Sequence, residues 1–130
     1  MTFCLGINVQ EGLISIADTR ITSGNECLTA RKVSVYEQEQ GAMFVMTSGL
    51  RSVRDKALTY FEEAWEEREE PFERLYEAVN LFSAQVRRVA KEDREPLERA
   101  GLSLNVHVLI GGQMSKDRTH KLYLMSLLSG

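Results

Sequence analysis

The sequence is poor in cysteine, proline and histidine, and it carries no large excess of charge of either sign. Its 130 residues include only two of each of these residue types. The net charge is −3 and basic residues are scattered among acidic ones, so no basic stripe is present to neutralise phosphates and a nucleic-acid partner is not expected. Neither His107 nor His120 has a cysteine or carboxylate at metal-ligand spacing, so no metal site is expected.

Long apolar segments are also lacking. The N-terminus has no positively charged stretch followed by an apolar run of roughly 7 to 15 residues, so no secretory signal is predicted. The apolar run LYLMSLL at 122–128 is far shorter than the roughly 20 residues that span a bilayer. These features predict a cytoplasmic protein without a membrane segment. In a reducing cytoplasm, Cys4 and Cys27 are expected to be free buried thiols rather than a disulfide.

The length is sufficient for one domain with one hydrophobic core, and we expect a single domain over residues 1–130. Two β-rich runs open it, at 3–9 and 13–19, and the short turn with Gly between them predicts an antiparallel hairpin. Alternating residues over 33–37 predict a half-buried strand. The segment AMFVMTSG at 42–49 predicts a fourth strand, and its apolar first residues indicate that both of its faces are covered.

Two amphipathic helices are predicted next, because apolar residues recur at spacings of three and four. The first spans about 51–69, and Pro71 separates it from the second. The second begins near Phe72 and is expected to end where Pro96 interrupts the pattern.

Strand patterns return at 102–112 and 121–128, which gives the order four strands, two helices and two strands. Since strands and helices are segregated, the predicted class is α+β and not a parallel βαβ fold. Strands that are apolar on both faces imply layers: helices on one side of the sheet, and a second sheet or further helices on the other.

Thr2 is a candidate nucleophile, because removal of Met1 would give it a free α-amine. The hydroxyl of an N-terminal threonine can attack a carbonyl while its own amine accepts the proton. The unperturbed pKa of that amine, about 7.7 to 8.0, lies near neutrality, so a fraction of the amine groups is in the free-base form. The alternative is an ordinary N-terminus, since many proteins begin with Met-Thr.

Asp18 and Lys32 could support such a nucleophile. An antiparallel hairpin returns to its origin, so Asp18 at the end of the second run is expected near the start of the first. A cationic Lys32 near the Thr2 hydroxyl would favour loss of its proton, and Asp18 would pair with and orient Lys32. The alternative is a surface salt bridge worth about 0 to 1 kcal/mol.

The segment TSG at 47–49 leads from a predicted strand into a predicted helix. Backbone N–H groups at such a junction can stabilise an oxyanion. Ser52 with Asp55 alternatively fits a helix capping box, and both interpretations use neighbouring amides.

Together these segments resemble the start of proteasome β-type peptidases, which are N-terminal-nucleophile (Ntn) hydrolases, and most of all the bacterial Anbu group. The resemblance is carried by MTFCLGINVQEGLISIADTR, TARKVSVYE and MFVMTSGL, and it runs from residue 2 to about residue 125. It implies the αββα sandwich of the Ntn hydrolases, of which this chain holds the N-terminal part.

The resemblance also implies roles for four residues. Thr2 matches the nucleophile, Asp18 the family's acid, Lys32 the lysine that tunes the nucleophile, and Gly49 the glycine whose amide forms the oxyanion hole. The implied activity is threonine-type hydrolysis of peptide bonds in peptides or unfolded proteins, without a metal or an organic cofactor. The implied assembly is a homo-oligomeric ring or open spiral.

Members of that family are longer, and they carry a further helix pair, more strands and a serine-containing catalytic segment beyond the matching part. Ser126 and Ser129 lie in an apolar segment with no pattern that would replace that serine. A second hypothesis is therefore a noncatalytic structural or regulatory subunit whose domain is incomplete at its C-terminus. The apolar run at 122–128 predicts association, because covering exposed apolar surface is favourable by about 25 cal/mol per Å².

Overall fold

A computed structural model gives the fold of the chain. It describes the backbone of residues 4–9, 12–17, 20–23, 26–29, 33–102 and 104–127, and the side chains of residues 33–102 and 104–127.

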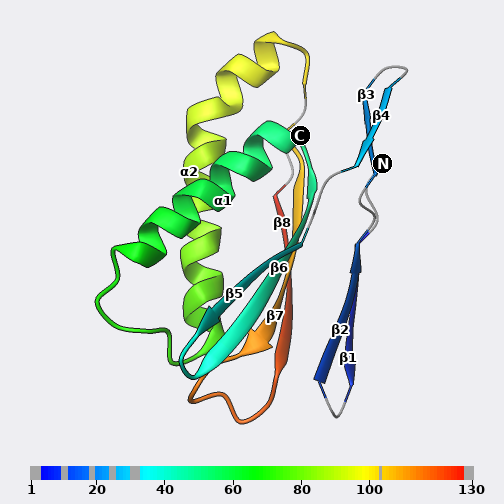
Figure 1. Ribbon diagram of the computed structural model, residues 1–130. Coiled ribbons are helices and arrows are strands. Elements are labelled where there is room, and N and C mark those ends of the chain that lie inside the picture. The colour runs from blue at the N-terminus through cyan, green and yellow to red at the C-terminus, as the bar shows by residue number, and fades with distance from the viewer. Residues whose placement is uncertain are drawn as a thin grey trace.

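Four antiparallel strands form the main sheet, in the order β5-β6-β7-β8 (Figure 1). These strands are β5 (Val33–Gln38), β6 (Gly41–Gly49), β7 (Val106–Gln113) and β8 (Lys121–Leu127). Each strand is antiparallel to its neighbour. Chain neighbours β5 and β6 form a hairpin, as do β7 and β8, and both helices lie in the connection between β6 and β7.

Two further hairpins precede this sheet. β1 (Cys4–Val9) pairs with β2 (Gly12–Ala17), and β3 (Arg20–Ser23) pairs with β4 (Glu26–Thr29), both antiparallel. The first hairpin lies beside the face of the main sheet that is turned away from the helices, and β1 contacts β6, β7 and β8 (Figure 1). The described elements therefore form helices, a sheet and a second β layer, which confirms the α+β class and the layered arrangement. The sequence predicted the first hairpin, whereas no strand was predicted at β3 or β4.

Two helices cover one face of the main sheet. α1 (Arg51–Glu66) packs on β6, and α2 (Leu75–Arg99) packs on β7 and β8. The core lies between the helices and the sheet, as the apolar periodicity predicted. Its largest fully buried side chains are those of Phe61, Phe72, Phe82, Met43, Leu75, Ile110, Val45, Val53, Val89, Val106 and Val108.

The end predicted for the second helix is wrong. Pro96 lies inside α2, which continues to Arg99, and the N–H of Ala100 donates to the carbonyl of Pro96 at 3.2 Å. A proline cannot donate its own backbone hydrogen bond, but its carbonyl still accepts one. Close to a helix end that loss is tolerated, and a proline there does not set the boundary.

An ionic cluster joins the outer surfaces of the two helices. The Lys56 ammonium lies 2.7 Å from the Glu92 carboxylate and 2.9 Å from that of Asp93. The Tyr60 hydroxyl donates to Glu92 at 2.8 Å. Hydrogen bonds from Lys56 and Tyr60 lower the pKa of Glu92, and the two carboxylates raise the pKa of Lys56. These side chains keep α1 and α2 in register on their solvent side.

A buried carboxylate fixes the start of α2 against the β7–β8 turn. Asp117 has 7% of its surface exposed, and its Oδ2 accepts the backbone N–H of Leu75 at 2.8 Å and that of Met114 at 2.9 Å. The N–H of Leu75 is one of the first-turn donors that have no partner within the helix. Asp117 therefore caps α2 from a loop that lies 42 residues further along the chain.

We expect Asp117→Ala to lower the free energy of unfolding by about 1 to 3 kcal/mol, because two buried N–H donors lose their acceptor. Urea titration followed by circular dichroism measures the change. Lys116→Ala in the same turn is the control; its exposed side chain pairs with Glu73, so its loss is expected to cost under about 1 kcal/mol. Equal midpoints for the two variants would contradict the role of Asp117.

Candidate functional site

The face of the main sheet turned away from the helices is called the inner face here. Along a strand, side chains alternate between the two faces, and the members of the core identify the helix side. The inner face is therefore formed by Val33, Val35, Glu37, Ala42, Phe44, Met46, Ser48, His107, Leu109, Gly111, Gln113, Leu122, Leu124 and Ser126. Most of these residues are apolar, and β1 contacts three of the four strands on which they lie.

One end of the inner face is polar. Ser48 of β6 pairs with His107 of β7, which in turn pairs with Ser126 of β8. The Nδ1 atom of His107 lies 2.9 Å from the Ser126 hydroxyl oxygen, a hydrogen bond between exposed side chains. Met46, Leu109 and Leu124 occupy the middle of the face, so the polar row forms its border next to Gly49.

Gly49 ends β6 and leads directly into α1. Its φ of +122° is a backbone conformation that L residues rarely adopt, and a Cβ atom at this position would lie 2.1 Å from the carbonyl oxygen of Asn105. Only glycine fits this junction, because the backbones of β6 and β7 approach so closely here.

The start of α1 has no side-chain cap. Leu50 occupies the N-cap position, and its carbonyl accepts the N–H of Arg54 at 3.0 Å. The proposed capping box of Ser52 and Asp55 is therefore wrong, since both residues lie within the helix. The N-terminus of a helix carries partial positive charge, so the first-turn amides next to Gly49 are suited to an anion. The alternative interpretation of TSG, an oxyanion-binding junction, remains a prediction.

Thr2, Asp18 and Lys32 lie outside the described residues, so their predicted roles stay predictions. The described residues nearest in sequence to Thr2 and Asp18 are Cys4 and Ala17, which pair directly in the β1–β2 hairpin. β1 begins and β2 ends toward the end of the molecule where β6 leads into α1 (Figure 1). The described backbone therefore directs both hairpin ends toward the region of Gly49.

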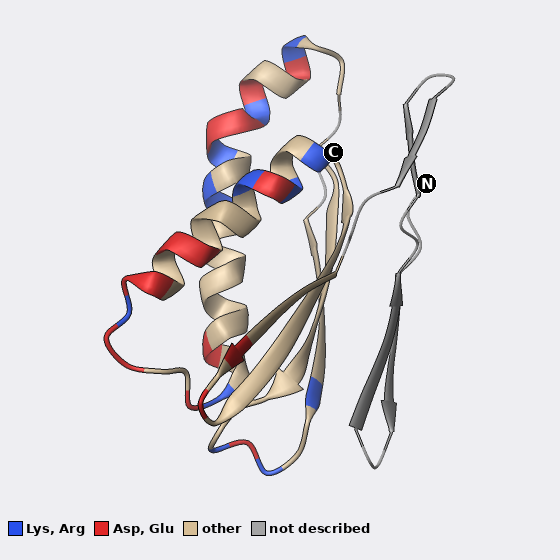
Figure 2. Ribbon diagram, viewed as in Figure 1, with Lys and Arg blue, Asp and Glu red and all other residues tan. Residues whose placement is uncertain are grey.

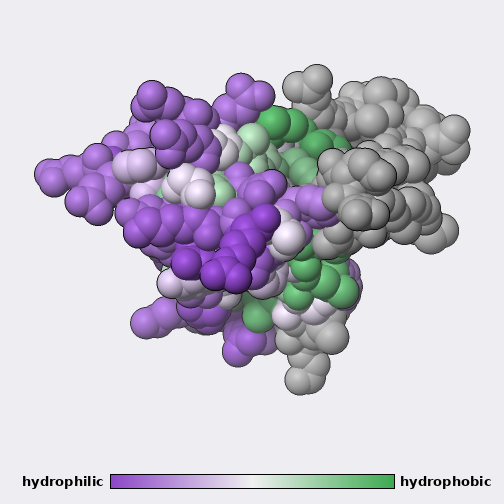
Figure 3. All heavy atoms as spheres, turned by 90° about the horizontal axis from the view of Figure 1, so that it is seen from below, coloured by the Kyte–Doolittle hydropathy of each residue, from purple (hydrophilic) through white to green (hydrophobic). Residues whose placement is uncertain are grey.

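The opposite end of the inner face contains an apolar hollow. Its volume is about 340 Å³, and its lining includes Val35, Phe44, Gly111 and His120. Figure 3 views the molecule from this end and shows hydrophobic residues exposed beside hydrophilic ones. Within the described residues, no three His, Cys, Asp or Glu side chains gather closely enough to hold a metal ion. No described helix is long and apolar enough to cross a membrane.

The sequence did not predict the contact between His107 and Ser126. Each residue was considered alone, His107 as a possible metal ligand and Ser126 as part of an apolar segment. Their pairing depends on the register of β7 against β8, which the length of the connecting turn sets. Within the described residues, His107 hydrogen-bonds only to Ser126, so the structure shows no Ser-His-carboxylate triad there.

Comparison with known proteins gives matches in structure only. No protein-family profile matches the sequence, and neither does any curated protein. The fold is similar to that of an Anbu (Gly-1) mutant from Hyphomicrobium sp. strain MC1, with a TM-score of 0.81 and 17% identity. It is also similar to Anbu (ancestral beta-subunit) from Yersinia bercovieri, with a TM-score of 0.78 and 20% identity.

A third similar structure is the helical assembly of the Anbu complex from Pseudomonas aeruginosa, with a TM-score of 0.79 and 18% identity. In all three comparisons the match covers 100% of this chain, but only 56% or 57% of the other chain. The chain thus has the Anbu fold over its whole length, as the resemblance predicted, and it spans about half the length of these proteins.

We expect Gly49→Ala to destabilise the protein by about 3 kcal/mol or more, because its Cβ cannot fit against Asn105 without separating β6 from β7. Gly101→Ala is the matched control. Gly101 also has a positive φ, +75°, but nothing lies within 4 Å of its added Cβ, so the expected cost is about 1 to 2 kcal/mol. Thermal unfolding compares the two variants, and similar melting temperatures would contradict the tight approach at Gly49.

Proposed function

We propose that the chain is a subunit of a threonine-type peptidase related to Anbu, which cleaves peptide bonds with Thr2 after removal of Met1. The observation that carries the proposal is the similarity of the whole chain to three Anbu structures with TM-scores of 0.78 to 0.81. The glycine-requiring junction at Gly49 supports it, because this residue matches the family's oxyanion-hole glycine.

In the proposed mechanism, the Thr2 α-amine accepts the proton of the Thr2 hydroxyl as that oxygen attacks the substrate carbonyl. The positive charge of Lys32 favours the deprotonated oxygen and the neutral amine, and Asp18 orients Lys32. The amide of Gly49 donates to the oxyanion that develops on the carbonyl. Collapse of the tetrahedral intermediate expels the amine of the substrate and leaves an acyl-enzyme, which water hydrolyses with the Thr2 amine as base.

The described structure is compatible with this chemistry at two points. First, the register of Cys4 with Ala17 directs the start of β1 and the end of β2 toward the same end of the hairpin. Second, the start of α1 has no side-chain acceptor for its first-turn amides. The substrates in this proposal are peptides or unfolded proteins, the protein is cytoplasmic, and residues 1–130 form one domain.

Assembly of several copies is part of the proposal. One of the similar structures is described as a helical assembly. We propose that this chain likewise forms a homo-oligomer, either a ring or an open spiral, in which the active sites are enclosed.

A second candidate function is a noncatalytic structural or regulatory subunit of the same fold. The observation that favours it is the coverage: the chain spans only 56% or 57% of the similar structures. In that case the fold and the assembly would remain, but Thr2 would not act as a nucleophile.

Labelling with a peptide epoxyketone distinguishes the two candidates, because this electrophile requires a hydroxyl and a free amine on the same residue. Intact mass first establishes that Met1 is removed. We expect one adduct, located on Thr2, and Thr2→Ala to lower peptide turnover by at least about 100-fold without changing the thermal midpoint.

Ser126→Ala is the matched control, because it removes a hydroxyl from the inner face and should leave labelling of Thr2 unchanged. A folded, processed protein that gains no adduct would refute the peptidase mechanism and favour the noncatalytic subunit.

A further inference from the structure

Arg54 is a buried cation near the start of α1. Its side chain has only 7% of its surface exposed, whereas the side chains of Arg51 and Asp55 have 60% and 57% exposed. Among the arginines that the structure describes, Arg54 is the only buried one. Arginine is almost never buried in a protein unless its charge is paired. The partners of this side chain are therefore the first question.

The pairing of Arg54 within the described residues is weak. Its Nε atom lies 3.6 Å from a carboxylate oxygen of Asp55, and its guanidinium forms no hydrogen bond to a described residue. Asp55 is also shared, because its other oxygen lies 3.4 Å from the Nε atom of Arg51. A buried charge costs free energy unless it is both paired and hydrogen-bonded. One exposed carboxylate thus serves two guanidinium groups and leaves the buried one incompletely satisfied.

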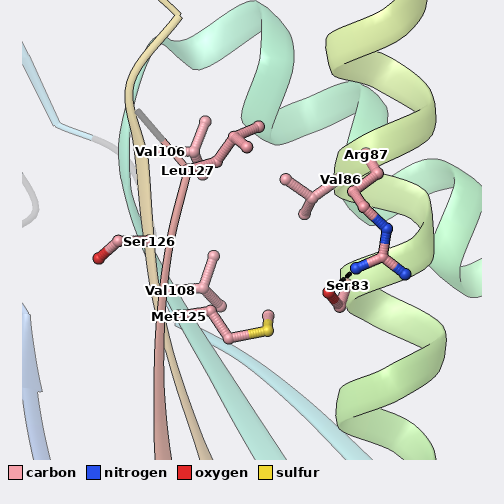
Figure 4. Close-up of a pocket in the computed structure, with 8 residues that line it drawn as sticks. All are labelled: Ser83, Val86, Arg87, Val106, Val108, Met125, Ser126 and Leu127. Atoms are coloured by element: carbon pink, nitrogen blue, oxygen red, sulfur yellow. Dashed lines mark hydrogen bonds between the residues drawn. The ribbon is translucent and has the colours of Figure 1, made fainter. Parts of the chain in front are cut away.

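Two arginines of α2 show the usual arrangement. Arg87 is exposed, and its Nη1 atom donates to the hydroxyl of Ser83 on the same helix at 2.6 Å (Figure 4). Arg88 is also exposed; it lies over the ring of Tyr60 and pairs with Glu92 at 3.3 Å. Both keep the guanidinium at the surface beside a partner, which is the arrangement that Arg54 lacks.

The charges of α1 are opposite to those that a helix favours at its ends. The N-terminal end of a helix carries partial positive charge, and the C-terminal end carries partial negative charge. The first turn of α1 contains no acidic residue, and its last turn contains no basic one. Figure 2 shows basic residues at the start of α1 and acidic residues at its C-terminal end. Arg51 and Arg54 therefore add to the positive potential at a helix start that has no side-chain cap.

Helix geometry directs the side chain of Arg54 toward the junction at Gly49. The N–H of Arg54 donates to the carbonyl of Leu50 at 3.0 Å, so Arg54 lies one helical turn from the residue that follows Gly49. Side chains of a helix lean toward its N-terminus and cover the preceding turn. Arg54 also shares the buried side of α1 with Ala57 and Phe61. Its cationic group is thus held on the sheet side of α1, at the end where Gly49 lies.

A peptide bound for cleavage could supply the missing partner. In the proposed mechanism the carbonyl oxygen of the peptide lies at the Gly49 amide, so the side chain of the same peptide residue extends next to the start of α1. A carboxylate on that side chain can accept two parallel hydrogen bonds from a guanidinium. The positive charge that is unfavourable in the empty protein would then favour an anionic substrate, as expected where a local rule is broken at a functional site.

We propose that Arg54 determines specificity, and that it selects substrates with a glutamate or an aspartate at the residue whose carbonyl is attacked. The carboxylate of that side chain pairs with Arg54 while the carbonyl oxygen lies at the Gly49 amide, and Asp55 stays paired with Arg51. This inference rests on the peptidase function proposed above and names its substrate class.

Two fluorogenic peptides test the preference. They differ only in having Glu or Gln at the residue whose carbonyl is attacked, and their ends are blocked, so the side chain carries the only carboxylate. We expect kcat/KM to be about tenfold or more higher for the Glu peptide. The measurement is made at about 500 mM NaCl, because salt screens exposed charges and removes a general attraction between protein and peptide.

Arg54→Met removes the charge and keeps most of the side-chain volume. We expect kcat/KM for the Glu peptide to fall to that for the Gln peptide, while the value for the Gln peptide stays within about twofold. The thermal midpoint should be unchanged or higher, because an apolar side chain replaces a buried charge. A role for Arg54 in folding alone predicts the reverse, a lower midpoint and the same loss with both peptides, and would overturn the proposal.

Arg54→Lys is a second variant that keeps the positive charge in the fold. An ammonium group cannot form the two parallel hydrogen bonds of a guanidinium, so we expect a preference for Glu that is weaker than in the unmodified protein. An unchanged preference in this variant would contradict the role of the guanidinium. Circular dichroism verifies that each variant is folded.

Lys56→Gln is the matched control, because it removes one positive charge from the same helix. Lys56 lies on the side of α1 that faces α2, where it pairs with Glu92 and Asp93. We expect the ratio of kcat/KM for the two peptides to equal that of the unmodified protein. A ratio that falls as much as in Arg54→Met would show a general effect of charge and overturn the specific role of Arg54.

Binding to Thr2→Ala separates this inference from the peptidase function, because it requires no reaction. Isothermal titration calorimetry with blocked Glu and Gln peptides should show tighter binding of the Glu peptide, and adding Arg54→Met should abolish the difference. Turnover without a preference for Glu would overturn the inference and leave the peptidase function intact. If neither turnover nor an epoxyketone adduct is found, the peptidase function fails, and equal binding of the two peptides would then overturn the role of Arg54 as well.

Discussion

The packing of Phe61 holds the described structure together. This fully buried ring of α1 lies 5.4 Å from the ring of Tyr36 on β5 and 5.3 Å from that of Phe82 on α2, both in edge-to-face geometry. Trp65 extends the cluster at 5.5 Å. Such pairs contribute about 0.5 to 1.5 kcal/mol each beyond area burial. One side chain thus joins both helices to the sheet, and the helix-side core depends on its position.

Much of this architecture could be predicted from periodicity, because the helices and the central strands bury one continuous stripe or face. The hairpin of β3 and β4 could not, since its strands are only four residues long and lie around a polar segment that looks like a loop. The end of α2 at Arg99 was also missed. Proline is a strong local signal, but near a helix terminus the loss of one hydrogen bond does not outweigh the remaining ones.

In the candidate site, too, features that depend on neighbouring residues could be predicted, whereas contacts between distant residues could not. The special backbone at Gly49 follows from a strand-to-helix junction that the segment TSG indicated. The contact between His107 and Ser126 could not be predicted, because the two residues are 19 positions apart and meet only through strand register. Sequence patterns identify which residues suit a chemistry, whereas the pairing of β7 with β8 determines which of them meet. The arrangement of Thr2, Asp18 and Lys32 belongs to the proposal.

The twist of the main sheet has a consequence for the helices that cover it. β-sheets twist with a fixed hand, by roughly 20 to 25° from strand to strand. That rotation accumulates from β5 to β8, so helices that rest on different strands of the sheet follow different directions. α1 on β6 and α2 on β7 and β8 accordingly cross at an angle instead of lying parallel (Figure 1).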